Sequence, residues 1–242
     1  MASGVAVMTR PPTERWKDRA FYTGMAAAAI ATVFRGFARS YFLRSRYFPT
    51  PLATIAKVHG AIFISWVVLF LVQTVLIARR RMDLHRRLGV LGAVLAGAVV
   101  ATGTTIAIVS LRYNVAHGNL GALSFFAIPV GNMVVFPILV AAALVWRRQT
   151  ETHKRLMLLA TTSILDAAVA RWPLAIMANG PIAFFAVADL FIVAGAIYDW
   201  VSRGRVHPAY LWGGLLIVGS QIVRLAIRHT AVWIAFARLF AA

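Results

Sequence analysis

Four histidines are spread along the first two thirds of the chain, at His59, His85, His117 and His153. An imidazole can bind a metal ion, exchange a proton near neutral pH or form a structural hydrogen bond. The 242 residues include no cysteine, which excludes disulfides, iron–sulfur clusters and thiolate ligands. Any metal or prosthetic group would therefore depend on His, Asp, Glu or Met, and the pattern does not identify the metal.

Two of these histidines lie in similar basic hinges, since His85 and His153 are each followed directly by two cations. One interpretation is a pair of ligands on facing helices, with cations such as Arg86 and Arg155 available for propionates or phosphates. The other interpretation is that both hinges anchor the chain to anionic lipid at the membrane edge.

The other two histidines are placed differently. His59 is expected on one helical face with Trp66 and Gln73, because these residues are seven positions apart. It could be hydrogen-bonded in a bundle interior, or it could act as a ligand or a proton carrier. His117 is expected in a short loop, over residues 112–121, which makes it the weaker candidate ligand.

The elements that position these residues are apolar helices. Hydrophobic residues make up 61% of the sequence and the mean hydropathy is +0.78, whereas a soluble domain is about half apolar. Several apolar stretches are long enough to cross a bilayer of ~30 Å. We predict an all-α polytopic membrane helix bundle, with residues 1–20 as a cytoplasmic tail and residues 21–242 as a single bundle. It has about seven transmembrane helices, at about 21–38, 52–78, 86–111, 122–146, 155–178, 182–201 and 208–230.

The charge distribution predicts the orientation of the bundle. The net charge is +18, but the cations gather at the ends of apolar runs, which is typical of bilayer anchors and not of nucleic-acid binding. With seven spans, 15 cations lie on the side of the N-terminus and 8 on the other, so the N-terminus is predicted to be cytoplasmic. We see no cleaved signal peptide and expect a bacterial inner-membrane protein. Its expected partners are anionic lipids and either other membrane subunits or further copies of the chain, but no nucleic acid.

Charged residues also occur inside the predicted spans, where they are costly unless paired. We expect an intramembrane polar network, in which Asp166 or Asp189 pairs with Arg224. Such a pair could be structural, or it could line a polar cavity for a proton or a small ligand. The candidate network comprises Asp166, Arg171, Asp189, Arg224 and Gln73.

Over about residues 55–175 the sequence resembles a family of bacterial predicted membrane proteins of unknown function. The resemblance rests on His59-Gly60, Trp66, Gln73, the His-Arg-Arg-Leu-Gly run at 85–89, Trp146, the His-Lys-Arg-Leu-Met run at 153–157 and Arg171. This family has no established activity to carry over.

The topology is also similar to the two-haem transmembrane b-type cytochromes, in which four consecutive helices each supply one histidine. That resemblance implies haem b held by His85 and His153 toward the cytoplasm, and by His59 and His117 toward the outside. The chain departs from this pattern at His117, which precedes its span, and at the shallow positions of His85 and His153.

Three functions follow from these observations. The first is a b-type cytochrome-like transmembrane electron carrier. The second is a non-catalytic accessory or assembly subunit of a membrane complex, and the third is a proton or small-solute transporter. No hydrolase or transferase motif is present, so any enzymatic role would be that of a membrane oxidoreductase component.

Overall fold

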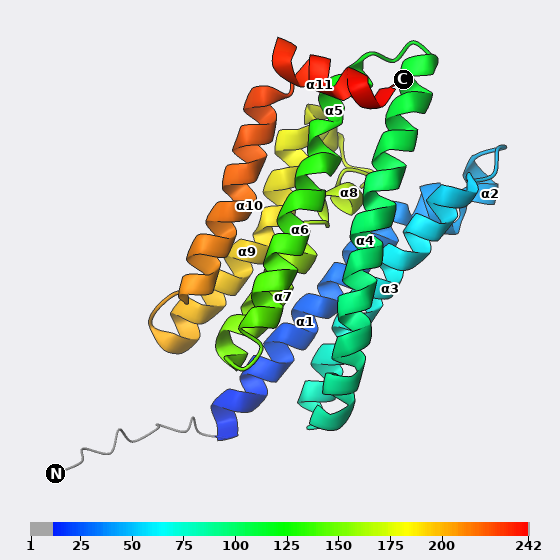
Figure 1. The fold of residues 1–242 in the computed structure, drawn as a ribbon. Coiled ribbons are helices and arrows are strands. Elements are labelled where there is room, and N and C mark those ends of the chain that lie inside the picture. Colours follow the sequence, from blue (N-terminus) through cyan, green and yellow to red (C-terminus); the bar gives the residue numbers. More distant parts are fainter. Residues whose placement is uncertain (1–11, 242) are drawn as a thin grey trace.

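The structure is a computed structural model that describes residues 12–241, and over this range the chain is helical with no strand. The first elements are α1 (Pro12–Phe37), η1 (Ala38–Phe42), α2 (Arg44–Tyr47), α3 (Thr54–Ala78) and α4 (Met82–Ala116). They are followed by α5 (Gly121–Phe125), α6 (Ala127–Val145), α7 (Thr150–Thr162), α8 (Asp166–Val169) and η2 (Ala175–Asn179). The last are α9 (Pro181–Arg203), α10 (Pro208–Ile227) and α11 (Ala231–Ala241), and most helices run along one direction (Figure 1).

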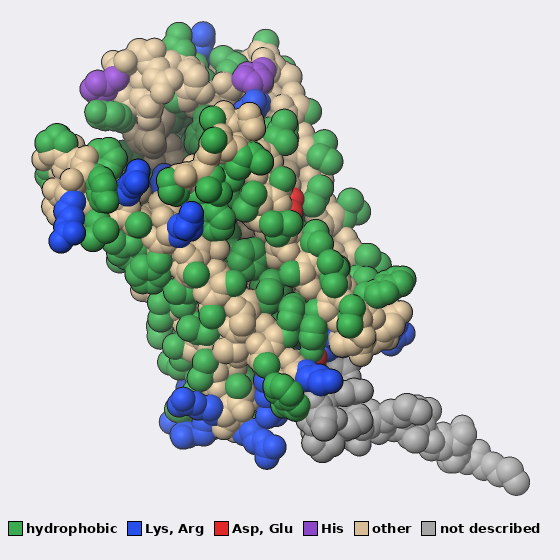
Figure 2. All heavy atoms as spheres, turned by 180° about the vertical axis from the view of Figure 1, so that it is seen from behind, with side chains coloured by type: hydrophobic (Ala, Val, Ile, Leu, Met, Phe, Trp, Pro, Cys, Tyr) green, Lys and Arg blue, Asp and Glu red, His purple; other side chains and the backbone are tan. Residues whose placement is uncertain are grey.

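Six of the described helices are long and apolar enough to cross a membrane. They are residues Trp16–Phe42, Thr54–Ala78, Met82–Ala116, Gly121–Val145, Pro181–Arg203 and Pro208–Ile227. Hydrophobic side chains cover the middle of the face seen in Figure 2, whereas Lys and Arg gather toward its two ends. The chain is therefore a multi-pass membrane protein, and its N-in orientation stays a prediction.

The predicted span at 155–178 is not one helix, and this corrects the sequence-based expectation. Helix α7 ends at Thr162, and only the short helices α8 and η2 follow it. The hydroxyls of Thr161, Thr162 and Ser163 donate hydrogen bonds back to backbone carbonyls three or four residues earlier. Such bonds bend helices, and Pro173 further on cannot donate a backbone bond at all.

The segment formed by α7, α8 and η2, called the broken segment below, nevertheless extends through most of the bundle beside α1. Its lower end is fixed where Lys154 donates a hydrogen bond to Asp18, at 2.7 Å. At its upper end, Gly36 of α1 lies directly against the backbone of Ala168. The stretch of α1 from Asp18 to Gly36 is about 27 Å long, close to the thickness of the hydrocarbon layer.

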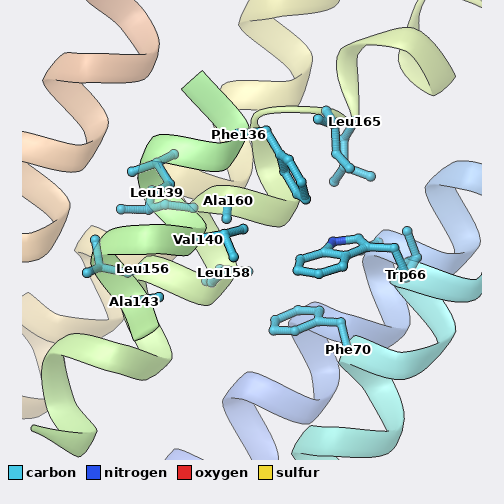
Figure 3. Close-up of a cluster of buried hydrophobic side chains, with 14 of the residues drawn as sticks. Trp66, Phe70, Phe136, Leu139, Val140, Ala143, Leu156, Leu158, Ala160 and Leu165 are labelled. Carbon is cyan, nitrogen blue, oxygen red and sulfur yellow. The ribbon is translucent and has the colours of Figure 1, made fainter. Parts of the chain in front are cut away.

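The main core lies where α3, α6 and α7 meet (Figure 3). Trp66 packs edge-to-face on Phe136, with ring centres 4.9 Å apart, and its indole N–H donates to the hydroxyl of Thr161 at 3.3 Å. Leu139 and Leu156 are fully buried beside them. Because an indole N–H in an apolar core requires a partner, Thr161 fixes the register between α3 and α7.

The C-terminal segment forms a separate helix, α11, that lies across the upper end of the bundle (Figure 1). Thr230 is its N-cap residue, since the Thr230 hydroxyl accepts a hydrogen bond from the backbone N–H of Trp233 at 3.2 Å. The indole of Trp233 in turn donates to the carbonyl of Leu123 in α5. Its apolar side chains Val232 and Leu239 are exposed, a pattern typical of helices that lie in a membrane interface.

The contact of α1 with α8 gives a direct test of the broken segment. A Cβ at Gly36 would overlap the carbonyl oxygen of Ala168, whereas a Cβ at Gly24 of the same helix would meet nothing within 4 Å. We expect Gly36→Ala to lower the free energy of unfolding by about 1–3 kcal/mol, because backbone cannot yield as a flexible side chain can.

The matched variant is Gly24→Ala, which should be neutral or slightly stabilising, since alanine favours the helix by about 1 kcal/mol over glycine. Thermal unfolding in detergent micelles measures both. Equal melting temperatures for the two variants would contradict the close approach of α1 and α8.

Candidate functional site

The structure brings His85 and His153 together at the lower end of the bundle. His85 lies in the first turn of α4 and His153 in the first turn of α7, so two separate hairpins supply them. Their ring centres are 6.4 Å apart and the ring planes are nearly perpendicular, at 87°. Two imidazoles that bind one metal ion at about 2 Å each would have ring centres roughly 6 Å apart, so this spacing suits two ligands of one metal ion.

Neighbouring groups orient both rings. The Nδ1 of His153 lies 2.8 Å from the carbonyl oxygen of Ala143, and because a carbonyl only accepts, Nδ1 carries the proton. In a neutral His153 the unprotonated nitrogen is then Nε2, whose lone pair is free, which is the usual arrangement for a metal ligand. The side-chain amide of Gln73 donates to the carbonyl of His85 at 3.2 Å and ties α3 to the start of α4.

Two buried polar atoms beside this pair have no protein partner within residues 12–241. They are the Nδ1 of His85 and the Oε1 of Gln73. Buried polar atoms are rarely left without a hydrogen bond, and exceptions point to a ligand or a water molecule. The described residues contain no group of three or more His, Asp or Glu that could hold a metal ion.

The structure does not bring His59 and His117 together. The ring of His59 packs on Phe63, which lies level with Gly103 of α4. His117 ends α4 at the upper surface, about 21 Å further along the helix, where its Nδ1 hydrogen-bonds the carbonyl of Tyr113. An outer pair of axial ligands from these two residues is not formed in this arrangement.

The two predicted anion-binding cations have different surroundings. Arg86 is exposed directly beside His85. Arg155 is completely buried and forms two parallel hydrogen bonds with Asp199 of α9, from Nε at 2.7 Å and from Nη2 at 2.5 Å. Arg155 therefore joins α7 to α9 and does not face the histidine pair.

A network of ion pairs surrounds this buried pair. Asp18 of α1 accepts hydrogen bonds from Lys154 and Arg203, and Glu151 forms ion pairs with Lys154 and Arg155. Arg203 also contacts Asp199, one turn away on α9, at 2.8 Å. Burial alone would raise the pKa of Glu151, but the hydrogen bonds from Arg155 and Lys154 outweigh it and lower the pKa to about 2.

Sequence reasoning missed Asp199 and Asp18. The available signal was the spacing of Asp199 and Arg203, four residues apart at the end of an apolar run, where a buried acid needs a cation.

The intramembrane charges form a second network in the upper half of the bundle. The expected direct pair between Arg224 and an aspartate is replaced by a relay. The guanidinium of Arg224 donates to the side-chain oxygen of Asn132, and the amide of Asn132 donates to both carboxylate oxygens of Asp166 at 2.8 and 2.9 Å. Asn132 can do this because its amide both accepts and donates.

Local packing explains this relay. Arg224 lies over Phe185 and passes directly over Gly131, where any Cβ would overlap its side chain. The neighbouring carboxylate, Asp189, accepts a hydrogen bond from Gln221 at 2.9 Å. Arg171 donates to the backbone carbonyl of Ala167 and lies outside this relay, while Gln73 is at the opposite end of the bundle, with His85.

No family model, curated protein or solved structure matches this chain significantly.

The buried pair gives a prediction with an internal control. Asp199→Ala should lower the free energy of unfolding by about 3–5 kcal/mol, because Arg155 would stay buried without a counter-ion. Asp83→Ala should cost less than about 1 kcal/mol, because Asp83 and its partner Arg81 are both 58% exposed at 3.6 Å. Unfolding by SDS titration in mixed micelles measures both.

A double replacement, Arg155→Met with Asp199→Leu, should recover most of that loss, since it removes both charges together. If the Asp199 variant and the double variant lose the same free energy of unfolding, then altered packing, and not an unpaired charge, is the cause of the loss.

The lowered pKa of Glu151 predicts an acid-sensitive contribution to stability. Since the folded pKa of about 2 lies below the ordinary value of 4.5, Glu151 stabilises the fold above pH 4.5 and loses this effect as the pH falls toward 2. Glu151→Gln should therefore lower the melting temperature at pH 7 and change it less at pH 3. A melting temperature that falls by the same amount at both pH values would contradict this pairing.

Proposed function

We propose that this protein binds one haem b through His85 and His153 and acts as a one-electron carrier at the cytoplasmic side of a bacterial inner membrane. The observation that carries the proposal is the meeting of the two imidazoles, 6.4 Å apart, from two helices that are distant in sequence. His85 and His153 would hold the iron, and a bound haem would supply reversible one-electron chemistry.

The surrounding residues support this assignment. The carbonyl of Ala143 holds the His153 ring in the tautomer that leaves Nε2 free, and Gln73 holds the backbone of His85. Such supporting hydrogen bonds fix the orientation of a ligand and raise its basicity. Arg86 and Arg87 are exposed next to His85 and are available for the two propionates, in place of the buried Arg155.

One haem at this end limits the reaction that the protein can support. Because His59 and His117 lie at different depths, the proposal includes a single haem and no second one toward the outside. The chain would exchange electrons with a partner that meets its cytoplasmic end, either a soluble carrier or a neighbouring membrane subunit. An electron path across the whole bilayer would need a further redox group from that partner.

The test is an ultraviolet–visible spectrum of the purified protein in detergent, oxidised and then reduced with dithionite. We expect a Soret band, with sharp α and β bands on reduction, and about one iron per chain by metal analysis. His85→Ala and His153→Ala should each lose these bands, whereas the matched control His117→Ala, which is exposed, should keep them.

His85→Met separates loss of the ligand from loss of folding. A Met–His pair still binds haem but raises its reduction potential, so the bands should persist with a higher midpoint potential. A flat spectrum with no iron in a monodisperse wild-type preparation would overturn the proposal. It would favour the accessory-subunit interpretation.

A further inference from the structure

The loop that joins α9 to α10 lies at the lower end of the molecule (Figure 1). A cavity of about 650 Å³ opens at this loop. Its lining includes Arg203, Arg205, His207 and Pro208 from this connection, together with Glu151 from the first turn of α7. Cavities of this size hold small ligands in many proteins. Nothing in the proposed electron transfer uses these residues.

Two guanidinium groups offer hydrogen-bond donors at the cavity. Arg205 is exposed and has no carboxylate or hydrogen-bond partner within residues 12–241. Arg203 uses its Nη atoms for Asp18 and Asp199, but its Nε is buried without a partner in the same range. An unused buried donor next to a free cation points to an anion as the missing partner.

His207 contributes a third donor. Its Nδ1 accepts a hydrogen bond from the backbone of Ala209 at 3.1 Å, so a neutral ring carries its proton on Nε2. Burial lowers the pKa of His207, and Arg155 lowers it further, which favours this neutral form. The same residue begins the 20-residue helix α10, whose positive dipole end lies at the cavity.

The charge balance also favours an anion. Among the described residues, the carboxylates of Asp18, Glu151 and Asp199 form ion pairs with Lys154, Arg155 and Arg203. Arg205 forms no ion pair within residues 12–241 and adds a positive charge to the cavity lining. By the distribution of cations along the chain, this end faces the cytoplasm, where lipid phosphates and soluble phosphates are both present.

We propose that this cavity is a phosphate-binding site, with Arg205, the Nε of Arg203 and the Nε2 of His207 as the donors. The ligand chemistry is a phosphate monoester or inorganic phosphate, because several donors from a guanidinium fork and an imidazole suit a tetrahedral dianion. The phosphate is either free in solution or the headgroup of an acidic lipid such as phosphatidic acid. The proposal does not depend on haem at His85 and His153.

The first arm of the test measures binding of inorganic phosphate to the purified full chain in a neutral detergent, by thermal shift and isothermal titration at constant ionic strength. Arg205→Gln should weaken phosphate binding roughly tenfold, because one charge-assisted contact is lost. The matched control is Arg148→Gln, which removes an exposed cation near the membrane at the same end but outside the cavity. It should leave the affinity unchanged.

The second arm distinguishes the source of the phosphate. The protein is placed in nanodiscs of phosphatidylcholine with or without phosphatidic acid, and retained lipid is measured by native mass spectrometry. If the ligand is a headgroup, phosphatidic acid should be retained by the wild type and by Arg148→Gln, and lost from Arg205→Gln. If it is free phosphate, lipid retention should be equal in all three and only the first arm should respond.

The proposal is overturned if phosphate neither stabilises nor binds the wild type and phosphatidic acid is retained equally by Arg205→Gln and Arg148→Gln. Absorbance of haem in the same samples is an independent readout, since Arg205 lies outside the histidine pair. Loss of phosphate binding with an intact spectrum, or the reverse, therefore separates this proposal from the proposed function.

Discussion

The lower half of the bundle depends on the buried ion pair between Arg155 and Asp199. Both side chains are completely withdrawn from solvent, so neither charge is tolerable without the other. A pair of this kind adds little net stability over well-packed apolar residues, but it is strict about geometry, because two parallel hydrogen bonds fix the angle and the depth of the partners. It therefore determines how α7 sits against α9.

Such a constraint is needed because α7, unlike the long apolar helices, is too short to be positioned by crossing the hydrocarbon layer. A helix of 13 residues is about 20 Å long and cannot span the hydrocarbon layer alone. Three hydroxyls bend the chain at its end, and the backbone beyond it must be satisfied within the protein. Asp166 contributes to this by accepting from the backbone of Ala167 and from Asn132. The polar relay to Arg224 is thus part of the support of a broken passage through the membrane.

The sequence was most informative where a single property dominates. Six of the roughly seven predicted spans correspond to long apolar helices, because only helices satisfy the backbone in lipid. The helices at Trp16–Phe42 and Met82–Ala116 extend four or five residues beyond the predicted spans 21–38 and 86–111 at each end. The shared side of the two basic hinges predicted that His85 and His153 would lie at one end, although hydropathy contains no distance between them. The break at Thr162 was missed, because apolar residues continue past it and the hydroxyl bonds that bend the helix are local. The partner of Arg155 was missed because pairing between distant helices depends on rotation about their axes, which composition does not encode.

The rotation of α7 about its own axis also explains why both candidate sites adjoin the first turns of this helix. Consecutive residues on a helix point about 100° apart, so one turn can supply several neighbours. Glu151 lines the cavity and Arg155 pairs with Asp199 of α9, whereas Lys154 reaches α1 and His153 reaches α4. Because the Arg155 pair fixes the rotation of this turn, a small turn of α7 would move His153 away from His85 and open the ion pairs beside the cavity together. The two sites are chemically independent, but they depend mechanically on the same helical turn.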